Sequence, residues 1–134
     1  MIETEVDGDV TRVTLSRPDR RNAFTEAGLR AVRSAVTGAE TSVVYLSGEG
    51  AAFSAGADLA VVRDLDREEA RAFARLGQSV ATAIETAEVV VVAGIDGPAR
   101  GGGVELALAC DVRVATPSAT FAETGVSLGL FGAW

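Results

Sequence analysis

Residues 89–111 read VVVVAGIDGPARGGGVELALACD, and this stretch decides the fold. Its first seven residues are aliphatic or small, which is the pattern of a buried strand. A turn rich in glycine follows at residues 96–103, and residues 104–109 are again almost entirely apolar, as in a short buried helix. A buried strand, a glycine-rich loop and a helix in this order are typical of α/β folds built from βαβ units.

The flanking sequence alternates between strand and helix patterns in the same way. An Asp-Gly turn at residues 7–9 separates two alternating runs, 2–6 and 10–15, and this predicts a β-hairpin. Thr25 is placed to cap a helix that runs to about residue 36. Further strands are predicted at residues 42–46, 112–115 and 119–121, and an amphipathic helix at residues 67–85. No repeat or linker divides the chain, so we expect one α/β domain.

The composition excludes several kinds of chemistry. The chain of 134 residues contains no histidine and a single cysteine, Cys110. Ser-His-Asp and Cys-His nucleophiles, an internal disulfide and most zinc sites are therefore excluded. The net charge is −7 and all 12 basic residues are arginines, which argues against general nucleic-acid binding. We expect no metal and no redox cofactor, and acid–base chemistry has to use carboxylates, tyrosine, water or the backbone.

The sequence also indicates where the protein works. Its longest apolar run, residues 89–95, is far shorter than the roughly 20 residues that span a bilayer. The acidic N-terminus, MIETE, lacks the positive charge of a secretory signal. We therefore predict a cytoplasmic protein that does not associate with membranes.

Two loops of small residues are candidates for a binding site. Residues 53–59 and 97–105 each follow a predicted buried strand and lead into a helix, so their free N–H groups could hold an anion. Two such loops on neighbouring strands could direct two N–H donors at one oxygen and form an oxyanion hole. Taken singly, either loop is more often structural than catalytic. A P-loop is excluded because the chain has no lysine, and a dinucleotide fingerprint fails because Leu106 replaces its last glycine.

Glu105 is the charged residue with the most unusual sequence context. It lies about one turn into the predicted helix, whose other residues are almost all apolar. An apolar environment disfavours the ionised form of a carboxyl group, which suits a general acid or base near neutral pH. An exposed glutamate that complements the helix dipole explains the same pattern, and periodicity favours neither interpretation.

Three co-linear stretches resemble the crotonase superfamily, also called the enoyl-CoA hydratase/isomerase family. They are LSRP and RNAF within residues 15–24, SGEGAAFSAGADL over residues 47–59 and GPARGGGVELALACD over residues 97–111. The resemblance covers essentially the whole chain. It implies a crotonase-like (ClpP/crotonase) α/β fold, a spiral of ββα units with two roughly perpendicular sheets. It also implies an acyl-CoA or enoyl-CoA substrate, with coenzyme A as part of the substrate and no separate cofactor.

The resemblance assigns roles to particular residues. It implies that the N–H groups of Ala57 and Gly102 form the oxyanion hole for the thioester oxygen. Glu105 matches the first of the two glutamates used by the family's hydratases. The coenzyme A part of the substrate would be held largely through backbone groups. The implied substrate-binding residues are Ala23, Ala55, Asp58, Leu59, Ala60 and Arg21, with Arg20 as an alternative to Arg21 beside a phosphate.

The sequence departs from the family pattern at the second catalytic carboxylate. Gly125 stands where the second hydratase glutamate is expected, and Ala133 stands near the position of an aspartate that some isomerases use. Glu123 lies two residues before Gly125 and could substitute if the backbone turns it inward. With Glu105 alone, we expect double-bond isomerisation, proton shuttling or decarboxylation rather than hydration.

The chain stops where the resemblance expects several further helices. We therefore expect residues 1–134 to be a single crotonase-like core domain that lacks the family's C-terminal helical region. The predicted function is an acyl-CoA enzyme of the enoyl-CoA hydratase/isomerase family, a lyase or isomerase that stabilises an enolate in a backbone oxyanion hole. The alternative is a non-catalytic acyl-CoA-binding or assembly subunit. The resemblance also implies a homo-oligomer, a trimer or a hexamer.

Overall fold

The computed structural model describes residues 2–129, 132 and 134. Within them the strands are β1 (Ile2–Asp7), β2 (Val10–Leu15), β3 (Val43–Gly48), β4 (Val90–Ile95), β5 (Pro98–Arg100), β6 (Val112–Ala115) and β7 (Thr120–Ala122). The α-helices are α1 (Glu26–Thr37), α2 (Leu59–Val62), α3 (Arg67–Glu85) and α4 (Gly102–Ala109). Two 3-10 helices, η1 (Pro18–Arg20) and η2 (Thr124–Leu128), complete the set.

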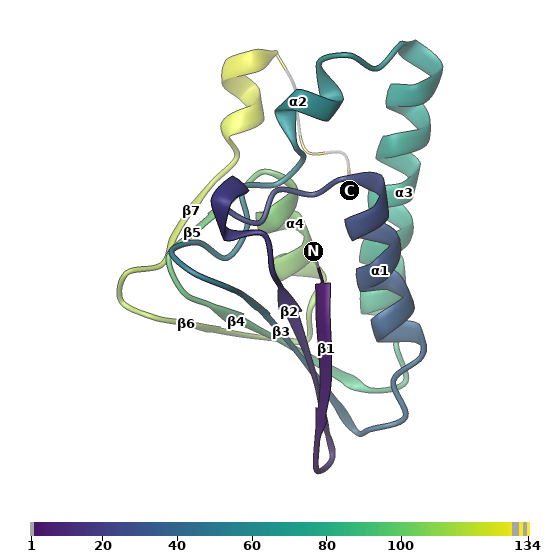
Figure 1. Cartoon of the computed structure of the whole chain (residues 1–134), viewed down its shortest axis with the longest axis vertical. Coiled ribbons are helices and arrows are strands. Elements are labelled where there is room, and N and C mark those ends of the chain that lie inside the picture. Colours follow the sequence, from purple (N-terminus) through teal and green to yellow (C-terminus); the bar gives the residue numbers. More distant parts are fainter. Residues whose placement is uncertain (1, 130–131, 133) are drawn as a thin grey trace.

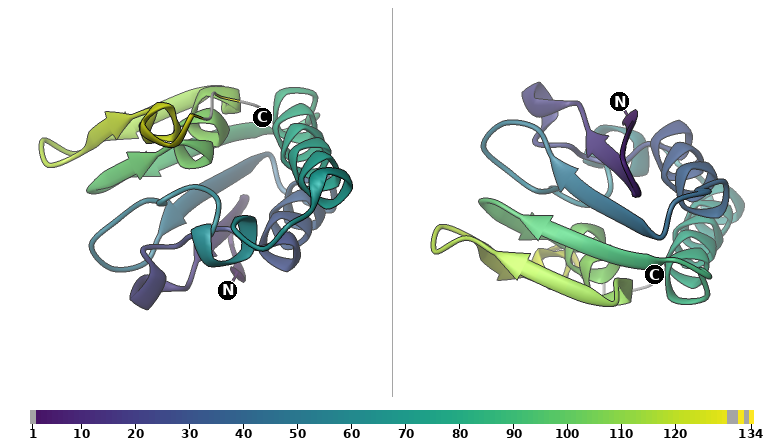
Figure 2. Two further views of the ribbon diagram at one scale, coloured as in Figure 1. Left: turned by 90° about the horizontal axis from the view of Figure 1, so that it is seen from above. Right: turned by 90° about the horizontal axis from the view of Figure 1, so that it is seen from below.

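Five strands form a sheet in the order β1-β2-β3-β4-β6 (Figure 1). β1 and β2 make an antiparallel hairpin, whereas β2, β3, β4 and β6 run parallel. The hairpin turn has two residues, and Gly8 adopts the positive φ of 60° that such a turn favours. Parallel neighbours need crossover connections, and α1, α3 and α4 lie within these connections. α1 and α3 lie together along one face of the sheet (Figures 1 and 2).

A second sheet pairs β5 with β7 in parallel. Its register joins Arg100 to Ala122, and the N–H of Gly101 extends the pairing to the carbonyl of Ala122 at 3.0 Å. A single bridge between Ser54 and Ala99 attaches the loop after β3 to the same sheet. Backbone pairing therefore holds the two glycine loops beside each other.

The core lies between the large sheet and the two long helices. α1 and α3 are amphipathic, and each buries its apolar stripe against this core. The largest fully buried side chains include Phe24, Phe53, Leu15, Leu29, Leu46, Ile84, Ile95 and Leu106. Because Phe24, Phe53 and Leu106 belong to the segments that surround the glycine loops, the core also fixes the position of those loops.

Most predicted elements are confirmed to within one or two residues. The cap of α1 is confirmed, because the Thr25 hydroxyl accepts a hydrogen bond from the N–H of Gly28 at 3.3 Å. α4 begins at Gly102, two residues before its predicted start, and Gly101 caps it with a positive φ of 47°. Three glycines in succession have low helix propensity and hide this start in the sequence. The short elements η1, α2, β5 and η2 are not predicted from the sequence.

Two kinds of feature are not found in the part of the chain that the structure describes. No helix there is long and apolar enough to cross a membrane. Nor does this described part contain a group of three histidine, cysteine, aspartate or glutamate side chains that could hold a metal ion.

Candidate active site

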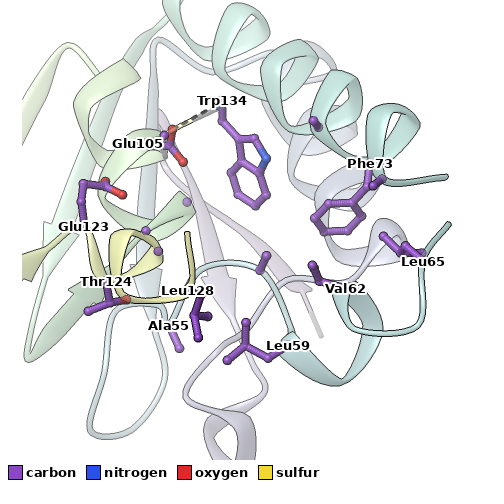
Figure 3. Close-up of a pocket in the computed structure, with 17 residues that line it drawn as sticks. Ala55, Leu59, Val62, Leu65, Phe73, Glu105, Glu123, Thr124, Leu128 and Trp134 are labelled. Carbon is purple, nitrogen blue, oxygen red and sulfur yellow. Dashed lines mark hydrogen bonds between the residues drawn. The ribbon is translucent and has the colours of Figure 1, made fainter. Parts of the chain in front are cut away.

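A pocket of about 260 Å³ lies where α2, α3, η2 and the start of α4 approach one another (Figure 3). Most of its wall is apolar, with Val62 and Leu65 from the α2 region, Phe73 from α3, Leu128 from η2, and Trp134. Both glycine loops also contribute small residues to the wall. The pocket therefore combines apolar side chains with exposed backbone, which is the usual composition of a ligand site.

Gly56 brings the two glycine loops into contact. It adopts a φ of 80°, a conformation that residues with a side chain rarely use. A Cβ atom at this position would lie 2.6 Å from the carbonyl oxygen of Arg100 and 2.9 Å from the nitrogen of Gly102. Only glycine fits here, and the loop after β3 packs directly against the start of α4 as a result.

The N–H groups of Ala57 and Gly102 lie at this junction, and both residues line the pocket. Phe24 donates to the carbonyl of Gly56 at 2.7 Å and accepts from the N–H of Asp58 at 2.9 Å, so the N–H of Ala57 between them points away from Phe24. Gly102 is the first residue of α4, where an N–H has no partner inside the helix. Neither N–H donates a hydrogen bond to another described residue. Both are therefore available to an oxygen atom of a ligand.

Glu105 lies one turn further along α4 and also faces the pocket. It is half-buried, and its Oε1 accepts a hydrogen bond from the backbone N–H of Trp134 at 3.0 Å (Figure 3). The indole of Trp134 packs against Phe24 and Phe73, with ring centroids 6.0 and 5.9 Å apart. These contacts place a carboxylate and an aromatic wall on the same cavity as the two backbone donors.

Glu123 is the second carboxylate on this pocket. It follows β7 directly and precedes η2. Burial of its carboxyl group, together with the negative charge of Glu105, raises the pKa of Glu123 above its ordinary value. Burial and the charge of Glu105 therefore both favour the protonated form of Glu123.

Asn22 fixes the loop after β3, which leads to Ala57. Its side-chain amide donates to the carbonyls of Glu49, Ala52 and Phe53 at 2.9, 2.8 and 3.2 Å. Its backbone carbonyl accepts from the Ser54 hydroxyl at 2.9 Å. Asn22 is buried and adopts a φ of 56°, which asparagine tolerates better than most residues. Asn22 belongs to one of the three motif stretches, but the sequence of that stretch does not reveal this structural role.

Two adjacent backbone donors and a carboxylate around a mostly apolar cavity are suited to stabilising a negative charge that develops on a carbonyl oxygen. The family model for enoyl-CoA hydratase/isomerase matches residues 5–134. The chain belongs to this family.

Relatives and solved structures of the enoyl-CoA hydratase/isomerase family agree with this assignment. A crotonyl-CoA hydratase from Syntrophomonas wolfei is 39% identical over 121 residues, which cover 87% of this chain and 46% of the relative. A short-chain-enoyl-CoA hydratase from Clostridium acetobutylicum is 35% identical over 131 residues, which cover 94% and 50%. An enoyl-CoA hydratase structure from Bacillus anthracis matches with a TM-score of 0.93 at 33% identity, covering 98% of this chain and 54% of that one. The predicted crotonase fold is thereby confirmed, and the chain spans about half the length of the curated relatives it matches.

The structure brings together five of the site residues implied by the family resemblance. The residues that line the pocket are Ala55, Ala57, Leu59, Gly102 and Glu105. The other four, Ala23, Asp58, Ala60 and Arg21, are not part of its wall. Their contact with coenzyme A stays a prediction, as does the role considered for Ala133, which lies outside the described residues.

The four implied site residues outside the pocket wall differ in their burial and in their hydrogen bonds. Ala23 is buried, and its carbonyl accepts from Arg17 at 3.2 Å. Asp58 is buried as well and caps α2 by accepting from the N–H of Ala60 at 3.0 Å. Arg21 is exposed, and its carbonyl accepts from the N–H of Ala55 at 2.8 Å. Ala60 is therefore the neighbour in sequence of Leu59, which lines the pocket. Arg21 is joined by its backbone hydrogen bond to Ala55, which also lines the pocket.

Sequence reasoning missed the wall that α3 supplies. Ala70, Phe73 and Ala74 line the pocket, whereas the sequence predicts only that residues 67–85 form an amphipathic helix. No sequence signal places Trp134 beside Glu105.

Proposed function

We propose that this chain binds an acyl-coenzyme A thioester in the pocket and stabilises the enolate of its acyl group. The N–H groups of Ala57 and Gly102 would bind the thioester oxygen, and Glu105 would transfer a proton at the α-carbon. The observation that carries the proposal is the close approach of the two loops at Gly56, since it gathers two free backbone donors at one cavity. The names of the two relatives, a crotonyl-CoA hydratase and a short-chain-enoyl-CoA hydratase, support the same class of substrate.

The physical argument rests on where charge moves during proton removal. When Glu105 takes the α-proton, the electron pair of the C–H bond passes into the thioester carbonyl and negative charge collects on its oxygen. Fixed N–H donors in an apolar cavity stabilise this charge more than water does, and removal of one such donor typically slows a reaction about 10²- to 10³-fold. Glu105 then returns the proton, so the group acts first as a base and then as an acid.

The test is exchange of α-protons in a saturated substrate, which needs one base and no hydration. The chain would be incubated with butyryl-CoA in deuterated water and the mass of the thioester followed with time. We expect deuterium uptake that falls about 10²- to 10⁴-fold in Glu105→Gln. Glu88→Gln is the matched control, because Glu88 is exposed and does not line the pocket.

The other outcomes distinguish the alternatives. Binding of butyryl-CoA by calorimetry without any exchange would overturn enolate chemistry and favour a non-catalytic acyl-CoA-binding or assembly subunit. Exchange that survives in Glu105→Gln would assign the base to another group. Absence of binding would overturn the proposal as a whole.

A further inference from the structure

Two glycines on different helices make room for the indole of Trp134. Gly77 lies within α3, and Gly102 is the first residue of α4. A Cβ atom at Gly77 would overlap the five-membered ring of the indole, at Nε1, Cδ1 and Cδ2. A Cβ atom at Gly102 would overlap the six-membered ring, at Cζ3, Cε3 and Cη2. The backbones of α3 and α4 therefore approach the two halves of one side chain.

The indole explains why a glycine stands at position 77. Glycine in the interior of a helix is destabilising relative to alanine, because it loses more conformational freedom on folding. Gly77 is buried near the middle of the 19-residue helix α3, and it is not one of the glycines with a positive φ. Its backbone would therefore accept any residue, and the three atoms nearest to an added Cβ all belong to Trp134. The physical reason for glycine here is space for the ring.

Two buried aromatic rings fix the indole further. The ring of Phe24 meets it at an interplanar angle of 64°, and that of Phe73 at 54°. The side chains of Phe24 and Phe73 are only 1% and 5% exposed, so neither can move aside without opening the core. The indole is therefore a rigid part of the pocket wall.

Trp134 touches both residues that would hold the reacting part of a thioester. Its ring lies against Gly102, whose N–H would bind the thioester oxygen. Its backbone N–H donates to Oε1 of Glu105, the proposed base at the α-carbon, at 3.0 Å. In Figure 3 the indole extends into the pocket between Glu105 and Phe73. The acyl carbons beyond the α-carbon begin within a few bonds of both residues, so a longer acyl chain meets the ring.

We infer that Trp134 determines the length of the acyl group, so that the site favours butyryl over octanoyl thioesters; this inference rests on the proposed function. The indole takes the space that further methylene groups would need. Because its slot is built from buried rings and helix backbone, it cannot yield to a longer chain at little cost. One methylene group too many or too few in such an apolar pocket changes a rate by about 10-fold or more.

The experiment compares α-proton exchange of butyryl-, hexanoyl- and octanoyl-CoA in deuterated water. We expect kcat/KM of the wild-type chain to fall with length, by at least about 10²-fold from butyryl to octanoyl. Trp134→Ala removes the ring but keeps the backbone N–H on Glu105, so the two thioesters should react within about 10-fold of each other. Phe121→Ala is the matched control, because Phe121 is half-exposed on β7 and does not line the pocket. It should keep the wild-type length profile.

A stability measurement tests the slot without any substrate. In the wild-type chain, Gly77→Ala forces a methyl group and the indole into the same space, so the midpoint of urea denaturation should fall. In the Trp134→Ala background the ring is gone, and the higher helix propensity of alanine should make the same change raise the midpoint. The two shifts should thus differ in sign. Equal shifts in both backgrounds would show that the ring does not occupy the slot and would overturn the inference.

The remaining outcomes separate this inference from the proposed function. Wild-type exchange of octanoyl-CoA as fast as that of butyryl-CoA would overturn the role of Trp134 and leave the proposed function intact. Trp134→Ala that accelerates both thioesters equally would also overturn it, because the ring would then block the site instead of limiting chain length. Absence of exchange with every thioester in the wild type would count against the proposed function and remove the basis of this inference.

Discussion

The carboxyl group of Asp58 joins two segments on which the site depends. It caps α2 and also accepts a hydrogen bond from Arg17 Nη1 at 2.7 Å, so it connects the loop before α1 to the loop after Gly56. Burial acts to raise the pKa of Asp58. The hydrogen bonds from Arg17 and Ala60 and the charges of Arg17 and Arg20 together outweigh burial, and the pKa lies below its ordinary value.

The lowered pKa of Asp58 predicts a dependence of stability on pH. Because the pKa is lower in the folded than in the unfolded chain, the ionised carboxyl stabilises the fold above the unfolded-state pKa, and this stabilisation is lost as the pH falls through the folded-state value. We expect Asp58→Asn to lose less of its free energy of unfolding than wild type between about pH 6 and about pH 3. Urea denaturation at several pH values measures this. The prediction would be contradicted if the free energy of unfolding of Asp58→Asn fell with pH as steeply as that of wild type.

Single residues also show how much of the site the sequence predicts. Glu105 and the donors Ala57 and Gly102 could be named, because their motif stretches are continuous in sequence and resemble a known family. The side chain of Glu123 could not be placed, because whether it reaches the pocket depends on the backbone between β7 and η2 rather than on residue type. Gly56 could be recognised as small but not as the contact between loops, since Gly102 is distant in sequence.

At the scale of elements, the start of α3 matters for the pocket because its early turns supply Ala70 and Phe73. Asp66 caps this helix by accepting hydrogen bonds from the N–H groups of Glu68 and Glu69 at 2.8 and 2.9 Å. Glu69 completes a capping box by accepting from the N–H of Asp66 at 2.9 Å. The cap holds the first turn of a helix whose next turn forms the pocket wall.

We expect Asp66→Ala to lower the free energy of unfolding by about 1 kcal/mol, the usual cost of losing such a cap. Glu69→Gln is the matched variant, because a side-chain amide oxygen can still accept from the N–H of Asp66, and it should cost much less. Urea denaturation of both variants under the same conditions measures the difference. Equal losses would show that charge near the helix N-terminus, rather than the hydrogen-bonded cap, stabilises this end.

Elements differ in how well the sequence predicts them. α3 could be predicted because a long apolar stripe and an acidic first turn mark the helix in the sequence. The hairpin could be predicted because Gly8 marks its turn. β5 was not, because its three residues include a proline and it exists only through pairing with β7. The four residues of α2 are too few to show a period, and Asp58 alone caps them.

At the scale of the whole molecule, Cys110 reports on the integrity of the core. Its side chain is buried at the end of α4 and donates to the carbonyl of Leu106 at 3.3 Å. Burial raises the pKa of Cys110 to about 12; the charge of Arg113 opposes this shift and that of Asp111 adds to it. Because the thiolate is the reactive form, the native chain should be nearly inert to thiol reagents.

We expect labelling of Cys110 by a small disulfide reagent at about pH 8 to be slower by more than about 10³-fold in the native chain than in the urea-unfolded chain. The native rate should rise with sub-denaturing urea, because the thiol is exposed when the core opens. Mass spectrometry of quenched samples measures both rates. Native labelling as fast as that of the unfolded chain would contradict the burial on which the prediction rests.

Trp134 is the only tryptophan of the chain, and its indole stands on the wall of the pocket, between the aromatic rings of Phe24 and Phe73. Its backbone is joined to the carboxylate of Glu105. Indole fluorescence from this protein therefore originates at the candidate site. A thioester that enters the cavity changes the polarity around the emitter, so the colour and intensity of the emitted light follow occupancy. The protein carries its own optical probe, and ligand entry can be timed in a stopped-flow instrument without attaching a dye.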